Sequence, residues 1–330
     1  MGNRIEWSSI AADGSQGRAH FGDPRREFDA ARTAAAVTPA AQFQLLLVHG
    51  TDAQAFLQAQ LTCDVDQVTP DRAAFGGYCT PKGRLLASMI LLRTTDAYLL
   101  LLPADIAAGI AERLRKFILR AKVKIETESS WRAIGLVGPQ AGPLLERAIG
   151  VVPAATLESR LQNDLSVTRL PGNVFLVCAP ISRVDAVWQT LSQGAVQAGA
   201  DCWSWAQVDA GIPWITTATQ DQFLPQMIGL DTIHGVSFDK GCYPGQEIVA
   251  RAKYLGEVKR GLRTASSAGA ASAGDAVQAD GQPVGTVLNA ASMPGGGSTM
   301  LAVLQTQAGA SNVLSLAGGE RIELQPVRAD

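Results

Sequence analysis

The sequence predicts an α+β fold: two units of split βαβ (ferredoxin-like) type, followed by a small antiparallel β-barrel. Strand-like runs and segments with helical period follow each other in two cycles, over about residues 42–127 and 131–210. After Arg263 the helical period disappears, and short apolar runs are separated by Gly, Pro and Asn. The chain has 330 residues, 47% of them hydrophobic, which is enough for two or three cores. We expect a polar lead-in over 1–35, an α+β domain over 36–255 that includes a motif segment after both cycles, and a barrel domain over 256–330.

The first cycle begins with FQLLLV at 43–48, an apolar run of strand length. Thr51 and Gln54 then form a capping-box pattern ahead of apolar residues at helical spacing. Residues 103–121 predict an amphipathic helix, and 122–126 alternate like a strand. The predicted inner face of that helix consists of Ile106, Ile110, Leu114, Phe117 and Ile118. Between the two helices lie three strand-like runs, RAAFGGYCT (72–80), RLLASMILL (84–92) and AYLLLLP (97–103), with a PKG turn at 81–83 after the first.

The second cycle begins with the strand-like run at 132–138 and a helix over 139–150. Strands are expected near 165–169 and 173–179, followed by a helix over 182–199 with its apolar residues inward. Strand-like residues return after Cys202, which completes a βαββαβ order.

The C-terminal part changes character. Residues 264–275 (TASSAGAASAGD) are small and of low complexity, and they predict a flexible loop. Short strands with turns are expected beyond it, and PGGGS at 294–298 reads as a hairpin loop because a P-loop lysine is absent.

The composition excludes several classes of protein. A formal net charge of −2 argues against a broadly basic nucleic-acid binder, and the apolar runs are too short to cross a bilayer. Five scattered cysteines without CxxC suit a reducing compartment. The lead-in, with a possible helix from about Pro24 to Ala36, carries neither a secretory apolar core nor the acid-poor composition of a mitochondrial presequence. We expect a cytoplasmic monomer that binds neither membranes nor nucleic acid directly.

The densest stretch of the chain is DKGCYPGQEIVAR at 239–251. A reactive thiol needs its thiolate stabilised, and Cys242 lies two residues from Lys240 and on the same segment as Arg251. Gly245 permits close backbone approach, and helical spacing resumes directly after it. The pattern favours a functional thiol at 242, whereas the other four cysteines lie in apolar runs and are expected to be inert core residues.

Several stretches together resemble the YgfZ/Iba57 family of folate-binding, iron–sulfur-related proteins. The most specific element is KGCYPGQE, and the resemblance covers roughly residues 42–326. The other matching stretches are VDAGIPW (208–214), FLPQ (223–226), CTPKGRLLA (79–87), LRAKVKI (119–125) and the run at 45–65.

The resemblance implies the fold of the aminomethyltransferase (T-protein) of the glycine cleavage system, with a central hole that holds tetrahydrofolate. It implies that Trp214 stacks on the pterin and that Gln226 accepts from the donor edge of the pterin. Lys240 and Arg251 would form the electropositive setting of Cys242, the functional thiol. The residues expected to bind the cofactor are Trp214, Gln226, Lys240, Tyr243, Gln246 and Arg251. No metal site is predicted, because one suitable cysteine cannot hold a four-iron cluster.

One departure from the T-proteins affects the predicted activity. T-proteins carry an aspartate pair after an early glycine turn, where this chain has Leu85, Leu86 and Ala87. Aminomethyl transfer would lack its acid/base partner there. The resemblance therefore implies folate-dependent assistance to iron–sulfur cluster assembly or repair, with effects on cluster-dependent tRNA-modifying enzymes. The expected partners are a reduced folate and iron–sulfur assembly proteins or client enzymes. A one-carbon transferase or demethylase, and a scaffold in which Cys242 is structural, are the alternatives.

Overall fold

The computed structural model describes residues 5, 7, 18–128, 130–254, 256, 259–308 and 313–325. The chain forms two compact units, each made of segments that are distant in the sequence. Unit 1 comprises Met1–Ala53, Gln67–Ala73 and Ile90–Ala206, and unit 2 comprises Gln54–Asp66, Ala74–Met89 and Gln207–Asp330. The predicted α+β fold with a C-terminal barrel is confirmed.

A six-stranded sheet in unit 1 has the strand order β11-β1-β7-β10-β9-β8. Its strands are β1 (Ala36–Pro39), β7 (Trp131–Val137), β8 (Ser159–Gln162), β9 (Leu165–Leu170), β10 (Val174–Pro180) and β11 (Val196–Gln197). Helices α4 (Ala141–Ile149) and α5 (Ile181–Ser192) pack onto it through Leu145, Trp188 and Leu191. Strand β8 was not predicted, because its four residues are too few to show alternation.

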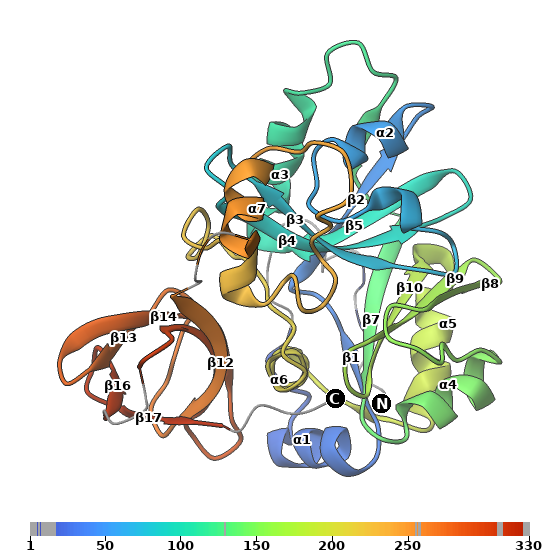
Figure 1. The fold of residues 1–330 in the computed structure, drawn as a ribbon. Coiled ribbons are helices and arrows are strands. Elements are labelled where there is room, and N and C mark those ends of the chain that lie inside the picture. The colour runs from blue at the N-terminus through green and yellow to red at the C-terminus, as the bar shows by residue number, and fades with distance from the viewer. Residues whose placement is uncertain are drawn as a thin grey trace. The chain divides into compact units, whose positions relative to one another are not determined.

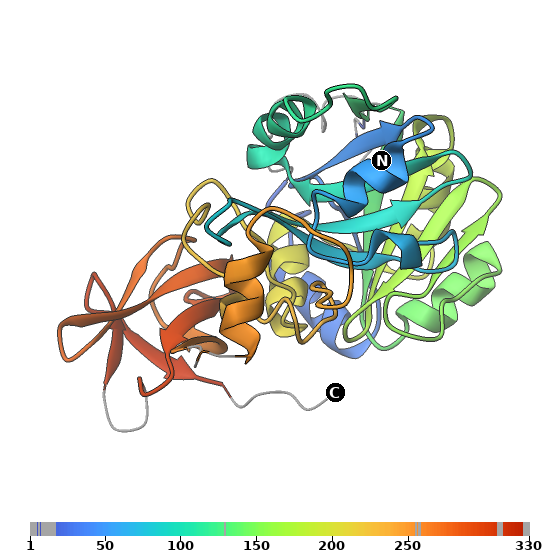
Figure 2. The same ribbon diagram turned by 45° about the horizontal axis from the view of Figure 1, so that its top comes forward.

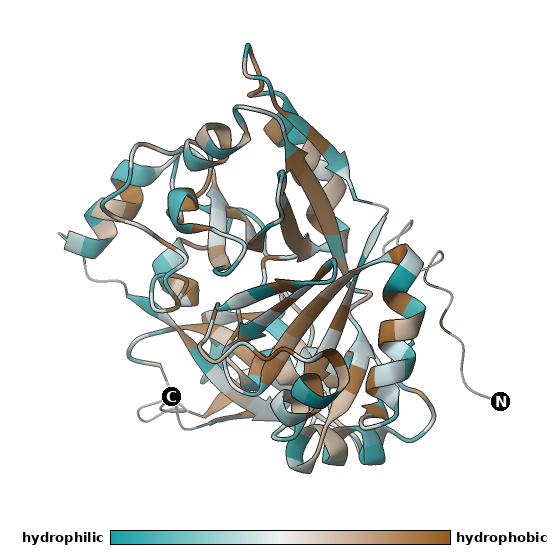
Figure 3. Ribbon diagram, turned by 90° about the vertical axis from the view of Figure 1, so that its right-hand side faces the viewer, coloured by the Kyte–Doolittle hydropathy of each residue, from teal (hydrophilic) through white to brown (hydrophobic). Residues whose placement is uncertain are grey.

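A five-stranded sheet has the order β3-β4-β5-β2-β6. Its strands are β2 (Phe43–His49), β3 (Ala74–Cys79), β4 (Leu85–Arg93), β5 (Ala97–Pro103) and β6 (Lys124–Thr127). Strands β4 and β5 are buried along almost their whole length, as burial on both faces requires, whereas the edge strand β6 exposes three of its four residues. Brown, hydrophobic strand ribbons are visible in Figure 3. Helices α2 (Ala53–Gln58) and α3 (Ala104–Arg115) complete a cycle of strand, helix, three strands, helix and strand. The second cycle, from β7 to β11, has the same order of strands and α-helices.

The C-terminal strands of unit 2 close into a barrel of order β12-β15-β14-β13-β16-β17 (Figures 1 and 2). They are β12 (Arg260–Ser267), β13 (Ala276–Ala279), β14 (Gln282–Ser292), β15 (Ser298–Gln305), β16 (Leu314–Leu316) and β17 (Arg321–Leu324). The predicted Gly-rich hairpin loop is confirmed between β14 and β15. The predicted loop at 264–275 is wrong over its first four residues, which belong to β12. Ala265 and Ser267 face inward there, and such small side chains give too weak a hydrophobic pattern to mark a strand.

The strand expected after Cys202 is also wrong. Residues Ala200–Asp209 form helix α6. Cys202, Trp203 and Trp205 are all buried in it. A helix that is buried around most of its circumference has no polar face, so its sequence lacks the 3.6-residue period that marks surface helices.

Helix α3 ends earlier than predicted, at Arg115. Phe117 and Ile118 therefore do not extend its inner face, and the Phe117 side chain is 49% exposed. The backbone N–H groups of Phe117 and Ile118 donate to the carbonyls of Leu114 and Arg115, three residues back. This tighter turn lets the chain reverse and pair β6 with β2, so tertiary pairing overrides the local helical period.

The N-terminal segment contributes to the core of unit 1. Helix α1 (Pro24–Thr33) begins where predicted, with the Asp23 side chain accepting from the Arg26 amide. Trp7 is buried and packs edge-on against Trp188, so the lead-in is not entirely a polar segment. Apart from Ile5 and Trp7, the predicted lead-in before residue 18 lies outside the described residues. The predicted domain bounds stay predictions. None of the described helices combines the length and apolar character that a membrane span requires.

Candidate functional site

The loop that carries Cys242 is fixed in unit 2 by the side chain of Lys240. The Lys240 Nζ donates to three backbone carbonyls, those of Gln58 (2.5 Å), Leu61 (2.8 Å) and Cys63 (2.8 Å). These carbonyls belong to the end of α2 and the turn after it, where a helix leaves acceptors without partners. The ammonium also lies 5.5 Å from the centre of the Tyr243 ring. Lys240 thus joins the motif loop to a segment about 180 positions earlier.

Burial lowers the pKa of Lys240, and the nearby Cys63, Asp64 and Asp66 side chains oppose this shift. All three N–H donors of the ammonium have carbonyl acceptors. This differs from the expectation that Lys240 is directed at the thiol of Cys242. Its predicted role in tuning that thiol stays a prediction, but the contacts of Lys240 are those of a clamp on the backbone.

The glycine at 245 docks the same loop onto the PKG turn between β3 and β4. Gly245 has φ +82°, and a Cβ there would lie 2.4 Å from the Thr80 carbonyl oxygen. A Cβ at Gly83, which has φ +73°, would lie 3.1 Å from the Cβ of Ile248. Two motifs that the sequence shows separately, 81–83 and 239–251, are therefore packed backbone to backbone, as only glycine permits.

Helix α7 (Gln246–Tyr254) begins directly after this contact. The Gln246 Nε2 donates back to the Lys240 carbonyl at 3.5 Å, and Arg251 is exposed on the last turn of the helix. Lys240, Tyr243 and Gln246 thus form one closed loop that presents Cys242.

Cys242 is the exposed cysteine of the chain. The other four are buried, as predicted. Burial raises the pKa of each of their thiols to about 12. The buried cysteines are Cys63, Cys79, Cys178 and Cys202. Access to solvent therefore distinguishes Cys242 from every other thiol.

The two aromatic residues predicted to bind the cofactor are buried. Tyr243 is 6% exposed, and its hydroxyl has no hydrogen-bond partner among the described residues. Burial raises the pKa of Tyr243, with a smaller contribution from Cys79. Trp214 is 3% exposed, and its backbone N–H and carbonyl bond to the Asn289 amide of β14 at 2.8 and 2.9 Å. Trp214 is thus attached to the barrel.

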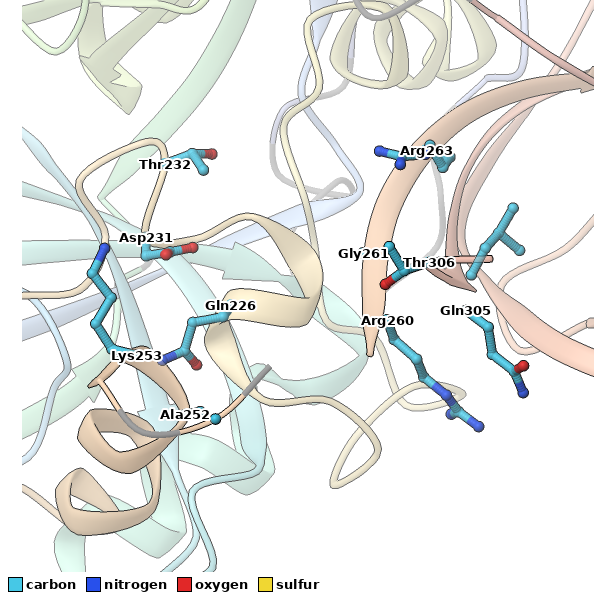
Figure 4. A pocket seen from close by; sticks show the side chains of 12 residues that line it. Gln226, Asp231, Thr232, Ala252, Lys253, Arg260, Gly261, Arg263, Gln305 and Thr306 are labelled. Atoms are coloured by element: carbon cyan, nitrogen blue, oxygen red, sulfur yellow. The ribbon is translucent and has the colours of Figure 1, made fainter. Parts of the chain in front are cut away.

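A pocket of about 400 Å³ opens in unit 2 between the 3₁₀ turn η2 (Pro225–Ile228), the end of α7 and the barrel strands β12 and β15 (Figure 4). Lys253 lies on one wall and Arg260 and Arg263 lie on the other, and among the described lining residues Asp231 is the single carboxylate. The pocket is therefore electropositive and suits an anionic ligand.

Gln226 is the predicted cofactor residue that lines this pocket. Its Nε2 donates to the Val249 carbonyl at 2.6 Å, which fixes the amide. Its Oε1 is buried and has no partner among the described residues. A buried acceptor without a donor costs free energy, so this oxygen is suited to a donor supplied by a ligand or water. Trp214 and Arg251 do not line the pocket.

The part of the chain that the structure describes contains no cluster of three or more His, Cys, Asp or Glu side chains able to hold a metal ion. Leu85 and Ala87, which the resemblance places where T-proteins carry their aspartate pair, are fully buried in β4.

Comparison with known proteins identifies the family. Residues 15–156 match the GCVT N-terminal domain. A "tRNA-modifying protein YgfZ" from Edwardsiella ictaluri is 32% identical over 290 residues, which are 84% of this chain and 86% of the relative. The chain belongs to the YgfZ family. A second YgfZ, from Colwellia psychrerythraea, is 31% identical over 67% of this chain and 68% of its own length.

The fold of this YgfZ-family chain is that of the T-protein. The crystal structure of aminomethyltransferase T of the glycine cleavage system from Bartonella henselae superposes with a TM-score of 0.75. The match covers 92% of this chain and 88% of that protein at 17% identity. The predicted family and fold are both confirmed.

Sequence reasoning missed two parts of the site. It did not find the carbonyls that bind Lys240, because nothing in a sequence marks a backbone acceptor that a distant side chain will meet. It did not single out Arg260 and Arg263, although the excess of Lys and Arg over residues 239–263 predicted that the basic segment 240–263 borders the folate cavity.

Proposed function

We propose that this YgfZ-family protein binds a reduced folate and assists the assembly or repair of iron–sulfur clusters on which tRNA-modifying enzymes depend. The observation that supports the folate part is the pocket of unit 2, where the buried Gln226 Oε1 without a donor lies near three cationic side chains. A reduced folate has an N–H-rich pterin at one end and glutamate carboxylates at the other. Its two ends match the two kinds of group in the pocket.

The residues present fit this cofactor. Lys253, Arg260 and Arg263 would bind the carboxylates, because charge-assisted contacts to carboxylates are the strong ones. Gln226 Oε1 would accept from an N–H group of the ligand while Val249 holds the amide in place. The pocket volume lies within the range of small-molecule sites. When bound, a reduced folate supplies a carrier for one-carbon units and a reducing ring.

The tRNA part of the proposal rests on the names of the two YgfZ relatives and on the exposure of Cys242. An exposed thiol on a loop fixed by Lys240 and Gly245 is accessible to a partner protein. One thiol cannot enclose a cluster alone, so contact with a cluster would be transient or shared with that partner.

The folate part is tested by calorimetry with tetrahydrofolate at low and high salt. We expect binding that weakens with salt, and Arg260→Gln with Arg263→Gln should weaken it about tenfold or more at low salt. Arg113→Gln changes an exposed residue of α3 outside the pocket; it is the matched control and should bind like wild type. Absence of binding by any reduced folate would refute the cofactor; binding that ignores salt and both substitutions would refute its place in this pocket.

The cluster part is tested by complementation in a strain that lacks its own YgfZ. Cys242→Ser is nearly isosteric and should leave folding and folate affinity unchanged, yet fail to restore activity of a cluster-dependent tRNA-modifying enzyme. Full complementation by that variant would show that the Cys242 thiol is not required for this function. Turnover of an aminomethyl or methylamine donor by the wild-type protein would instead establish a transferase.

A further inference from the structure

The last turn of α3 and the segment that connects it to β6 carry an unusual concentration of positive charge. Residues 113–124 contain six Lys or Arg and no Asp or Glu, in a chain whose net charge is −2. All six are exposed: Arg113, Arg115, Lys116, Arg120, Lys122 and Lys124. Glu112 pairs with Lys116 at 3.8 Å, but among the described residues Arg120 and Lys122 form no ion pair. The segment belongs to unit 1, so the pocket of unit 2 does not account for it.

Two large apolar side chains lie in the middle of this charge. Phe117 is 49% exposed and Leu119 is 88% exposed, the largest exposed fraction among the large hydrophobic residues described. Figure 1 shows the segment as a loop beyond the end of α3. Single exposed hydrophobic residues are common on proteins, but two of them on one twelve-residue segment with six exposed cations form a distinctive surface segment. We call residues 113–124 the basic–apolar loop.

The base of the basic–apolar loop is firmly held. The Lys122 amide donates to the Asp52 Oδ2 at 2.7 Å, and the Asp52 amide donates to the Lys122 carbonyl at 3.4 Å. Gly50 has φ +121°, and a Cβ there would lie 2.0 Å from the same carbonyl oxygen. At the other end, the Phe117 amide bonds to the Leu114 carbonyl, and Leu114 is fully buried. Phe117 and Leu119 are therefore presented on a turn that is tied at both ends.

We propose that the basic–apolar loop is a docking surface for an acidic protein with an apolar pocket that receives Leu119 and Phe117. Apolar side chains at the centre with charged residues around them are the arrangement found in protein interfaces. The cations would steer an acidic partner and set its orientation. The proposal does not depend on folate binding by unit 2.

The side chains favour a protein over the other polyanions. Single-stranded nucleic acid is bound through aromatic side chains that stack on bases, and the more exposed apolar residue here is the aliphatic Leu119. A membrane surface is bound by a long amphipathic face or a lipid anchor, whereas this loop offers two apolar side chains on a tight turn. Two apolar side chains on a tight turn fit a pocket on the surface of a partner protein.

The test begins with a photo-crosslinking amino acid, p-benzoylphenylalanine, placed at position 119 of the full chain in cells. The matched control is the same probe at Leu161, an aliphatic residue of unit 1 that is 37% exposed. Mass spectrometry of the adducts should identify an acidic protein that crosslinks from 119 and not from 161. Adducts of position 119 with RNA or lipid, or no specific adduct, would overturn the proposal.

The identified protein is then purified and its Kd measured with four forms of this chain. Phe117→Ala with Leu119→Ala should weaken binding about tenfold or more, because the two anchors are lost. Arg120→Glu with Lys122→Glu should slow association and reduce the dependence of Kd on salt. Leu161→Ala and the wild type should bind alike. An unchanged Kd in both loop variants would refute the docking surface, and tetrahydrofolate affinity, which should be the same in all four forms, reports separately on the proposed function.

Discussion

The three hydrogen bonds of Lys240 lead to a prediction about stability. Lys240→Met keeps most of the aliphatic stem but removes the ammonium that bonds to the carbonyls of Gln58, Leu61 and Cys63. A hydrogen bond to a charged group contributes about 1.5–3 kcal/mol, and contributions of neighbouring bonds do not add fully. Leu61 and Cys63 are fully buried, so water cannot readily replace the lost donor.

An opposing effect limits the loss. Burial lowers the pKa of Lys240, which means that the folded state holds the charged ammonium at some cost in desolvation. Methionine removes that cost. We therefore expect Lys240→Met to reduce the free energy of unfolding by about 2–4 kcal/mol, below the roughly 4.5–9 kcal/mol that three independent bonds would give.

The assay is urea unfolding at neutral pH, where a loss of this size lowers the midpoint by roughly 1 M. Lys82→Met, on the exposed turn between β3 and β4, is the control and should leave the midpoint unchanged. Lys240→Arg should recover only part of the loss, because a planar guanidinium cannot direct its donors as an ammonium does. Amide hydrogen exchange should rise over residues 58–63 in the methionine variant. An unfolding midpoint equal to that of wild type would refute the proposed stabilisation by the Lys240 hydrogen bonds.

Three further predictions concern thiols and glycines. Iodoacetamide under native conditions should label Cys242 well before the four buried cysteines, as peptide mass spectrometry would show; equal labelling of all five would contradict the exposure seen here. Because burial raises the pKa of Cys178 from 9.0 to about 12, its neutral thiol contributes stability that is complete below pH 9 and is lost as the pH rises toward 12. The free energy of unfolding measured with urea should therefore fall above pH 9, by up to about 1.4 kcal/mol per pH unit for each such thiol, and less steeply in Cys178→Ala. Gly245→Ala should lower the melting temperature by several degrees, since its Cβ would lie 2.4 Å from the Thr80 oxygen, whereas Gly241→Ala, with no atom within 4 Å, should melt near the wild type.

The sequence predicts well the elements whose apolar residues form a clear pattern. Helix α5 buries one face, so its helical period identifies it, and the barrel strand β15 is buried at six of its eight residues, so it shows as an apolar run of strand length. Helix α6 and the last four residues of β12 lack such a pattern: the helix is buried around most of its circumference, and the strand residues have side chains too small to mark a face. In both cases neighbours distant in the sequence decide the conformation.

The same limit applies to the site. The motif at 239–251 identifies Cys242 as a candidate, and its exposure agrees with that reading. The sequence also shows a cation two residues from the thiol, but it does not show that backbone acceptors near residue 60 hold that cation. Proximity along the chain predicts that a positive charge lies near the thiol. The direction in which a long side chain points depends instead on the acceptors that the fold supplies.

The matching element order of the two cycles has a consequence for how this architecture arose and how it can be altered. Such a match is what duplication of one ancestral module produces. The turn between β3 and β4 has its counterpart in the turn between β8 and β9, where Asn163 and Asp164 are exposed with positive φ. The loop that carries Cys242 packs against the turn between β3 and β4, so the sequence of that turn is constrained. The second turn is exposed, with the Asn163 carbonyl accepting from the Arg183 side chain, and residues 163–164 are therefore a suitable place to attach a label or a fused domain to this protein.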